Sequence, residues 1–170
     1  MINDWRTEIV KAVVVRRHLE SRDEIYSYPL PEVAASEGDI QAAEAVVGPL
    51  DARHRTFLKH ADGWKGFLQK IDLFGTAQLM GAPPMRQVRE AIAAVGEEAF
   101  SAFAGFDIRD VVPIGGSDSQ TDLWLLAKPD AANAGQVLWF WGSDYELYSN
   151  FDEFYLAMVD YNRLALQELQ

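Results

Sequence analysis

The stretch from Leu50 to Gly75 constrains the fold more than any other part of the chain, and it reads LDARHRTFLKHADGWKGFLQKIDLFG. Its first half places apolar residues at the spacing of one helical face, which predicts a helix over residues 50–61. Asp62 and Gly63 follow, and a glycine in the left-handed conformation commonly closes a helix. The pair therefore predicts that the helix stops there.

Large apolar side chains come directly after this predicted stop. Trp64, Phe67 and Leu68 lie where the chain is expected to turn, and leaving them in water would cost about 1.5–3 kcal/mol each. We therefore expect the turn to fold back into the core. Residues 71–74 follow as a short strand-like run that ends at Gly75.

Three further helices are indicated by the 3.6-residue period of their apolar residues. They cover residues 5–20, 36–48 and 85–103. Gly96 marks the weakest point of the last one, because glycine costs about 1 kcal/mol relative to alanine inside a helix. A closing helix is expected from Phe151 to about Leu169, because Asn150 and Glu153 have the spacing of a capping box.

From about residue 110 onward the period changes from that of helices to that of strands. Four short runs are rich in β-branched and aromatic residues: VVPIGG, TDLWLLAK, QVLWFWG and YELYS. The two middle runs are apolar on both faces, which is typical of central strands, and the short connections favour antiparallel neighbours. The sequence thus predicts an α+β fold in which a mostly antiparallel sheet of about four to six strands packs with several helices. The length indicates a single domain over residues 1–170.

The chain is strongly acidic, with 26 acidic residues, 15 basic residues and a net charge of -11. This balance excludes binding to nucleic acid through its phosphates and disfavours contact with an anionic membrane, because both need a cationic surface. A basic protein surface, in contrast, would be attracted from a distance. An alternative interpretation is that the acidity only keeps the protein in solution.

Neither export nor membrane insertion is predicted. The N-terminal apolar run has charges on both sides, and the longest uncharged apolar run elsewhere, VLWFWG, is far too short to span a bilayer. Cysteine is absent, which rules out disulfides and Cys nucleophiles and fits a reducing compartment. We therefore expect a cytoplasmic location.

The sequence shows no motif for catalysis, cofactor binding or metal binding. His54 and His60 lie six residues apart on one predicted helix, hence on different faces, so they could not share a metal ion. The turn GGSD lacks the residues of a phosphate-binding loop and of a nucleophile elbow. We therefore expect no catalytic residue, metal or cofactor, and a carboxylate-based enzyme acting on a small molecule is kept as an alternative.

The C-terminal half combines aromatic residues with carboxylates, and this combination suits the binding of a cationic protein surface. We predict a partner-binding surface made of residues of both kinds from the strand region and the turns beside it. The predicted residues are Asp118, Asp122, Trp141, Asp144, Tyr145 and Glu146.

The order of several short motifs resembles the SUKH superfamily, also called the SMI1/KNR4 family. These motifs are FLKHADGW, IDLFG, VVPIGGSDSQTDLWLL, GQVLWFWG and SNFDEFYLAM. The resemblance implies an SMI1/KNR4-like α+β fold and a binding role. Five residues that match the family pattern are interpreted as structural: Gly63, Trp64, Phe74, Gly75 and Phe154.

Many bacterial members of this family are immunity proteins. The resemblance therefore implies a non-enzymatic cytoplasmic protein that binds and neutralises a cognate polymorphic or contact-dependent toxin domain. Many such toxins are nucleases, and an acidic protein could plug a basic nuclease cleft. A regulatory protein-interaction module without a toxin partner is the alternative. In either case we expect a monomer or a weak homodimer.

Overall fold

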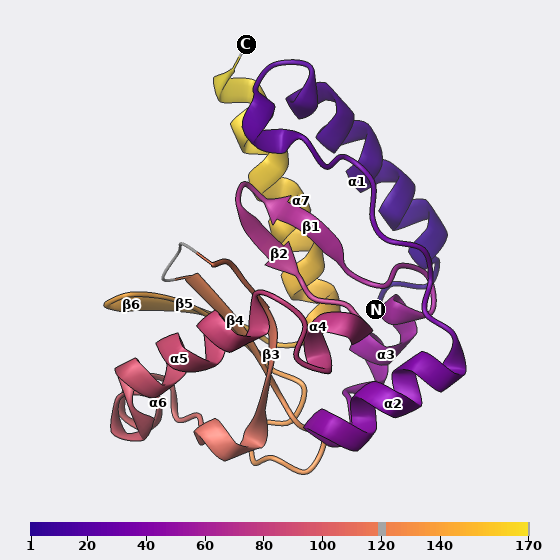
Figure 1. Ribbon diagram of the computed structural model, residues 1–170. Coiled ribbons are helices and arrows are strands. Elements are labelled where there is room, and N and C mark those ends of the chain that lie inside the picture. Colours follow the sequence, from indigo (N-terminus) through magenta and orange to yellow (C-terminus); the bar gives the residue numbers. More distant parts are fainter. Residues whose placement is uncertain (119–121, 170) are drawn as a thin grey trace.

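A computed structural model describes residues 1–118 and 122–169 and shows an α+β fold (Figure 1). Within these residues seven α-helices pack with one six-stranded antiparallel sheet, whose strands follow one another in chain order from β1 to β6. The predicted fold class is therefore confirmed. No helix in the described part of the chain is long and apolar enough to cross a membrane.

The N-terminal part is mainly helical and contains one hairpin. Its elements are α1 (Trp5–Glu20), the 3₁₀ turn η1 (Glu24–Tyr26), α2 (Glu37–Val47), α3 (Ala52–Leu58), β1 (Trp64–Leu68), β2 (Ile71–Leu73), α4 (Thr76–Leu79), α5 (Met85–Val95) and α6 (Glu97–Ala104). The rest of the sheet and the closing helix follow. Their elements are the 3₁₀ turn η2 (Ile108–Asp110), β3 (Val111–Gly116), β4 (Asp122–Ala127), β5 (Val137–Trp141), β6 (Asp144–Tyr148) and α7 (Phe151–Glu168).

Local chemistry accounts for most helix boundaries. The Asp4 carboxylate caps α1 by accepting two backbone N–H groups, and Ser36 forms a capping box with Asp39 at the start of α2. The predicted helix over residues 85–103 breaks at its weak point, Gly96, whose φ of 86° separates α5 from α6. The predictions for these helices are confirmed.

Two expectations for the segment from Leu50 to Gly75 are wrong. The first is that Gly63 closes a helix: α3 already ends at Leu58, several residues earlier. Gly63 has its positive φ of 89° in a different setting, since a Cβ atom there would lie 2.5 Å from the backbone nitrogen of Gly75. A Cβ atom on Gly75 would lie 2.0 Å from the carbonyl oxygen of Asp62. The two glycines therefore allow two backbone segments to touch.

The second wrong expectation concerns the aromatic stretch after Gly63, which forms strand β1 rather than a turn. The chain reverses later, at Gln69 with a φ of 53°, and β1 and β2 form an antiparallel hairpin. The register of this hairpin is irregular, and Phe67 and Leu68 are both buried although they are consecutive. The large side chains thus belong to the core, as expected, but a strand carries them there.

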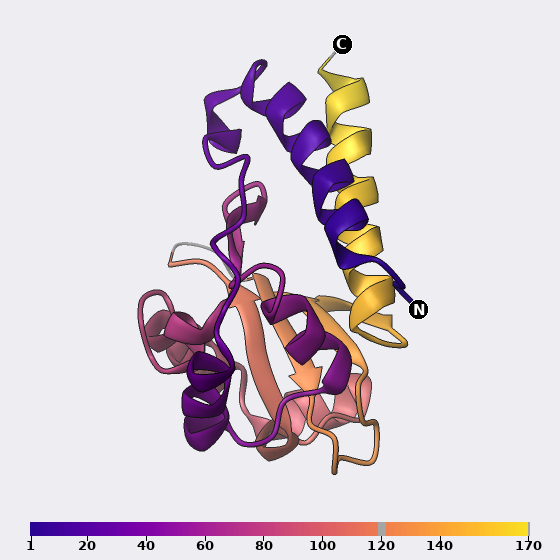
Figure 2. The ribbon, with the colours of Figure 1, turned by 90° about the vertical axis from the view of Figure 1, so that its right-hand side faces the viewer.

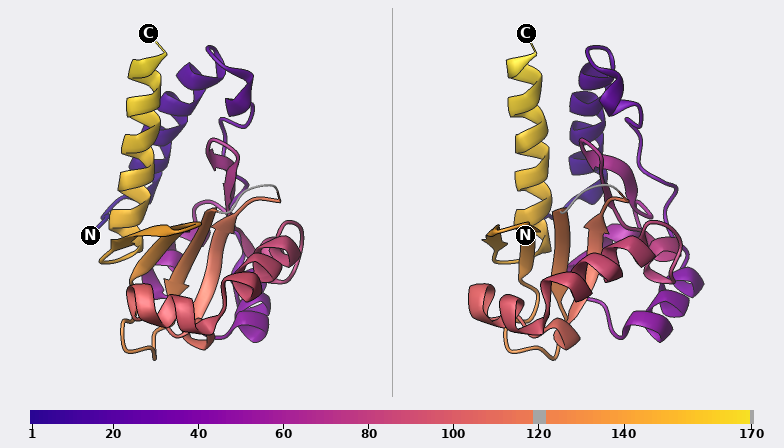
Figure 3. Two further views of the ribbon diagram at one scale, coloured as in Figure 1. Left: turned by 90° about the vertical axis from the view of Figure 1, so that its left-hand side faces the viewer. Right: turned by 60° about the vertical axis from the view of Figure 1, so that its left-hand side comes forward.

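Helices cover both faces of strands β3 to β6 (Figures 1 and 3). On one face Phe100 of α6 packs on Phe140, with ring centroids 5.3 Å apart. On the other face Phe154 of α7 packs on Trp124, with centroids 5.1 Å apart. Strands β4 and β5 each have a neighbour on both sides, as their apolar sequences predict. Thr121, the first residue of the run that predicted β4, lies outside the described residues.

Helices α1 and α7 lie side by side and extend away from the sheet, next to the β1–β2 hairpin (Figure 2). Near the beginning of both helices, the Trp5 ring lies 5.0 Å from that of Tyr155. Just beyond their ends, the Arg22 side chain donates a hydrogen bond to the carbonyl oxygen of Leu169 at 3.4 Å. The two helices therefore run in the same direction.

Tyr155 of α7 connects this helix pair to the rest of the core. Its ring contacts those of Trp5 in α1, Phe57 in α3 and Phe67 in β1, with centroid distances of 5.0, 5.7 and 5.3 Å. Further along α7, the Asn162 amide donates to the carbonyl oxygen of Phe67 at 2.8 Å. The hairpin is therefore held against α7 by aromatic packing and by a buried hydrogen bond.

Arg16 of α1 is fully buried beneath the loop that follows the helix. Its guanidinium lies over the Tyr26 ring, 5.0 Å from the centroid, and its Nη2 donates to the carbonyl oxygen of Tyr28 at 3.3 Å. Within the described residues, its Nε and Nη1 have no hydrogen-bond partner. Burial lowers the pKa of Arg16 to about 10, so the group is still charged at neutral pH.

Replacing Arg16 with methionine should leave the free energy of unfolding unchanged or raise it by about 1 kcal/mol, because methionine keeps the buried stem and removes a poorly paired charge. Urea unfolding at neutral pH measures the effect. Arg17→Met, at an exposed neighbouring position, is the matched control and should change stability little. A loss of more than about 1 kcal/mol in Arg16→Met would show instead that the guanidinium stabilises the fold.

Candidate partner-binding site

Four of the six predicted partner-binding residues come together at one end of the sheet. Asp122 of β4 lies opposite Trp141 of β5, which in turn lies opposite Asp144 of β6. Residues opposite each other in neighbouring strands point to the same face, and Glu146 points there too because it is two residues beyond Asp144. This face, toward which α7 packs, therefore carries three carboxylates and an indole.

The other two predicted residues lie elsewhere. Tyr145 is one residue away from Asp144 and is opposite Phe140, so it belongs to the face covered by α6. Asp118 is exposed in the turn after β3 and lines a different cavity, of about 370 Å³, together with Asp72. The six residues thus do not form one continuous surface, and their binding to a partner stays a prediction.

Two aromatic residues that were not predicted complete the four-residue group. The indole Nε1 of Trp139 donates a hydrogen bond to Oδ1 of Asp122 at 2.9 Å, and the hydroxyl of Tyr161 in α7 donates to Oε2 of Glu146 at 3.1 Å. The Trp139 ring lies edge-on to those of Trp141 and Tyr161, with centroids 5.0 and 5.5 Å away. The name acidic–aromatic surface is used below for six residues: Asp122, Trp139, Trp141, Asp144, Glu146 and Tyr161.

Sequence signals for these two residues were present but incomplete. Strand alternation links Trp139 to the predicted residue Trp141, since side chains two positions apart in a strand share a face. Tyr161 lies seven positions after Phe154, which places both on one side of α7. Neither signal tells which strand end α7 reaches, because that depends on how the helix crosses the sheet.

Burial and the Glu146 carboxylate together keep the Tyr161 phenol protonated by raising its pKa. Burial raises the pKa of its phenol, and the neighbouring Glu146 carboxylate raises it further. The phenol is therefore a neutral donor over the physiological pH range, which keeps the bond to Glu146 in place. The rings and the carboxylates of the surface are thus oriented by one another.

The carboxylates of the acidic–aromatic surface have no cationic partners among the described residues. No Lys, Arg or His nitrogen there lies within ion-pair distance of Asp122, Asp144 or Glu146. Their hydrogen bonds from described residues come from neutral donors: the Trp139 indole, the Tyr161 hydroxyl and, for Asp144, the backbone N–H of Tyr145. They are therefore available to an external cation.

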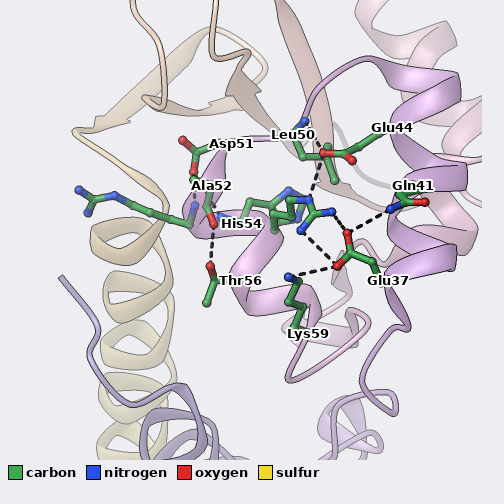
Figure 4. A network of polar contacts seen from close by, with 11 residues as sticks. Glu37, Gln41, Glu44, Leu50, Asp51, Ala52, His54, Thr56 and Lys59 are labelled. Carbon is green, nitrogen blue, oxygen red and sulfur yellow. Dashed lines mark hydrogen bonds and ion pairs between the residues drawn. The ribbon is translucent and has the colours of Figure 1, made fainter.

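Acidic residues on α2 are used differently (Figure 4). Glu37 forms ion pairs with Arg55 and Lys59, and Glu44 pairs with Arg55 at 3.3 Å. Hydrogen bonds from Arg55 and then from Lys59 hold the pKa of Glu37 at about 2. This network joins α2 to α3 and leaves these carboxylates already paired, so we do not place the partner site there.

The cavity nearest to the acidic–aromatic surface has a volume of about 560 Å³ and is named here the hairpin groove. It lies between the β1–β2 hairpin, η1 and α7, and its residues include Asp122, Trp139 and Tyr161 of the surface. Within the described residues, no three His, Cys, Asp or Glu side chains are placed to hold a metal ion. The groove thus combines the carboxylates of Asp122 and Glu168 with the aromatic rings of Trp139 and Tyr161.

The five residues interpreted as structural are all buried away from this surface. Gly63 and Gly75 form the backbone contact described above, and Trp64 and Phe74 flank it with 1% and 0% of their surface exposed. Phe154 packs between Trp124 and Tyr148. Their positions explain how the hairpin and α7 meet the sheet, and they offer no surface to a partner.

Comparison with known proteins adds one finding. The model of the SMI1 / KNR4 family (SUKH-1) matches residues 34–157, which extend from just before α2 into α7. The match covers the whole sheet, including the acidic–aromatic surface except Tyr161, and it leaves out α1. No curated protein matches the chain.

Proposed function

Because the chain belongs to the SMI1 / KNR4 family (SUKH-1), we propose that it is a non-enzymatic, cytoplasmic protein of the immunity type that binds and neutralises a cognate toxin domain. Family membership supports an immunity-type or related function, and the resemblance in the motifs suggests a polymorphic or contact-dependent toxin. The specific partner, its one-to-one complex and its location are our proposal.

The observation that carries the proposal is the acidic–aromatic surface. Its carboxylates have no cationic partners among the described residues, and the rings of Trp139 and Tyr161 are oriented by hydrogen bonds to two of these carboxylates. Tryptophan and tyrosine beside unpaired carboxylates provide both contact area and attraction for a basic surface. The net charge of -11 steers such a partner toward the protein. A toxin nuclease with a cationic cleft has the complementary chemistry.

Co-expression with the product of the neighbouring gene tests the function directly. We expect the chain to restore growth of cells that produce the toxin and to co-purify with it in a one-to-one complex. Co-purification with a non-toxic protein, without any rescue, would contradict the immunity role and favour the regulatory alternative.

Association with the toxin domain should depend on salt. Raising the ionic strength from about 0.01 to 0.15 M shortens the Debye length from about 30 to 8 Å and should lower the association rate constant by at least about tenfold. Stopped-flow fluorescence measures this rate. A rate constant that does not change over this range would rule out attraction through the acidic–aromatic surface.

A pair of double variants locates the charges responsible. Asp122→Asn with Glu146→Gln removes two carboxylates of the surface and should slow association at low salt by about tenfold. Glu98→Gln with Asp130→Asn removes two exposed carboxylates outside it and gives the same net charge. Equal slowing in both variants would show that only the overall charge matters and not this surface.

A further inference from the structure

We propose that the hairpin groove is the pocket that receives an arginine side chain of the partner, an inference that rests on the proposed binding function. The groove has a volume of about 560 Å³, which is ample for one long side chain and the backbone next to it. Its position beside the acidic–aromatic surface makes it continuous with the site described above.

The walls of the groove include apolar side chains from two elements that are joined by a hydrogen bond. Leu68 and Ile71 of the hairpin lie on one side, and Tyr161 and Leu164 of α7 lie on another. The Asn162 amide donates a hydrogen bond to the carbonyl oxygen of Phe67, which joins these two sides. A preformed pocket loses little conformational entropy when it binds a side chain.

The α7 wall exposes an aliphatic and an aromatic side chain. Tyr161, Leu164, Ala165 and Glu168 recur at the spacing of one helical face, and all four line the groove. Leu164 is 54% exposed and Tyr161 37% exposed. A ligand lying in the groove would cover these side chains, which supplies a hydrophobic contribution for the stem of an arginine.

Charge in the groove selects the occupant. Asp122 and Glu168 are acidic and form no ion pair with a described residue, whereas Lys70 is the basic residue among those that line the cavity. Asp122 accepts the Trp139 indole N–H with Oδ1, and no described residue donates a hydrogen bond to its Oδ2. An acidic group would be repelled, and so would a second copy of this chain with its net charge of -11.

The Trp139 indole favours a guanidinium in particular. Its N–H points to the Asp122 carboxylate, which fixes the ring and increases the electron density that its face offers. A guanidinium is planar, so its face can stack on an aromatic ring while the N–H groups at its edge bond a carboxylate. A lysine ammonium cannot do both. The ring and the carboxylate are adjacent here, so one arginine can use the two together.

A peptide titration tests this without the toxin. The probe is acetyl-Gly-Arg-Gly-amide, and the readout is the indole N–H signal of Trp139 in a proton–nitrogen NMR spectrum, assigned with the Trp139→Phe variant. We expect this signal to shift and saturate with the arginine peptide while the buried Trp5 and Trp64 signals stay in place. The matched peptide with citrulline, which has the same shape without the charge, should bind at least about fivefold more weakly.

Single variants connect the effect to the groove. Asp122→Asn can still accept the indole N–H, so it keeps the ring in place and removes the charge; it should weaken arginine binding by about fivefold. Asp130→Asn removes an exposed carboxylate beyond the far end of β4 and should bind like the unmodified protein. An unmoved Trp139 signal, equal binding of the citrulline peptide or equal effects of the two variants would each overturn the proposal.

The titration also separates this inference from the proposed function. Rescue from the toxin without any binding of the arginine peptide would leave the immunity role standing and remove the arginine pocket. Binding of the peptide without rescue would keep the pocket and overturn the toxin as its partner.

Discussion

Replacing Trp64 with alanine is expected to lower the free energy of unfolding by about 3–5 kcal/mol, which is the cost of truncating a large buried aromatic side chain. Trp64 is 1% exposed and its ring lies 5.2 Å from that of Phe67. Its indole N–H donates to the carbonyl oxygen of Tyr28 at 3.1 Å, which ties the long loop after α1 to the hairpin. The change would open a cavity and also leave this carbonyl with fewer donors.

Urea unfolding of two further variants separates these contributions. Trp64→Phe keeps most of the buried ring and loses the hydrogen bond, so its effect should lie between zero and that of Trp64→Ala. Trp141→Ala removes the same side chain from a half-buried position and should cost much less. A loss in Trp64→Ala no larger than that in Trp141→Ala would contradict the central place of Trp64 in the fold.

Acid should destabilise the protein through His54 well before it titrates most carboxylates. His54 is fully buried beside the Phe151 ring, with centroids 4.9 Å apart. Burial lowers its pKa to about 3, so the folded state keeps the ring neutral, whereas the unfolded chain takes up a proton near pH 6.5. Between these values the unfolded state binds more protons, and stability therefore falls as the pH falls.

The expected size of this effect is about 1.4 kcal/mol per pH unit below 6.5, or about 2–3 kcal/mol on going from pH 6.5 to 4.5. Above about pH 7.5 His54 should contribute no slope, because it is neutral in both states. The measurement is the free energy of urea unfolding at several pH values between 4.5 and 8.

The His54→Leu variant isolates this contribution, since its carboxylates titrate as before and only the imidazole is missing. The variant should lose the part of the slope that begins near pH 6.5. His18→Leu, the same change at an exposed position of α1, should keep the slope of the unmodified protein. Parallel pH profiles for His54→Leu and the unmodified protein would show that His54 is not held neutral.

The fold was largely predictable because its elements are patterned locally. The helix start at Ser36 and the weak point at Gly96 both depend on residues within a few positions of each other, and both lie where the sequence indicates. The apolar runs that became β4 and β5 indicate interior strands for the same reason. The single-domain reading stays a prediction.

The candidate site was predictable only in part. Asp122, Trp141 and Asp144 come together because an antiparallel register follows from short connections between strands. Tyr145 lies apart from these three residues, since a step of one residue along β6 moves a side chain to the opposite face. Asp118 lines the cavity of Asp72 instead, because it follows Gly116 by two residues and Gly116 lies opposite Asp72 in the neighbouring strand β2.

The sequence by itself determined most of the helices and the strands β3 to β6, the family, and the acidic character that suits a basic partner. Only the tertiary structure decided that Gly63 meets Gly75, that Trp139 and Tyr161 orient the carboxylates, and that a groove lies beside them. The physical reason is distance along the chain. Helix caps and the periodic spacing of apolar residues depend on residues that are close in sequence. The contacts named here form when segments far apart in the chain pack together, and no local pattern in the sequence specifies them.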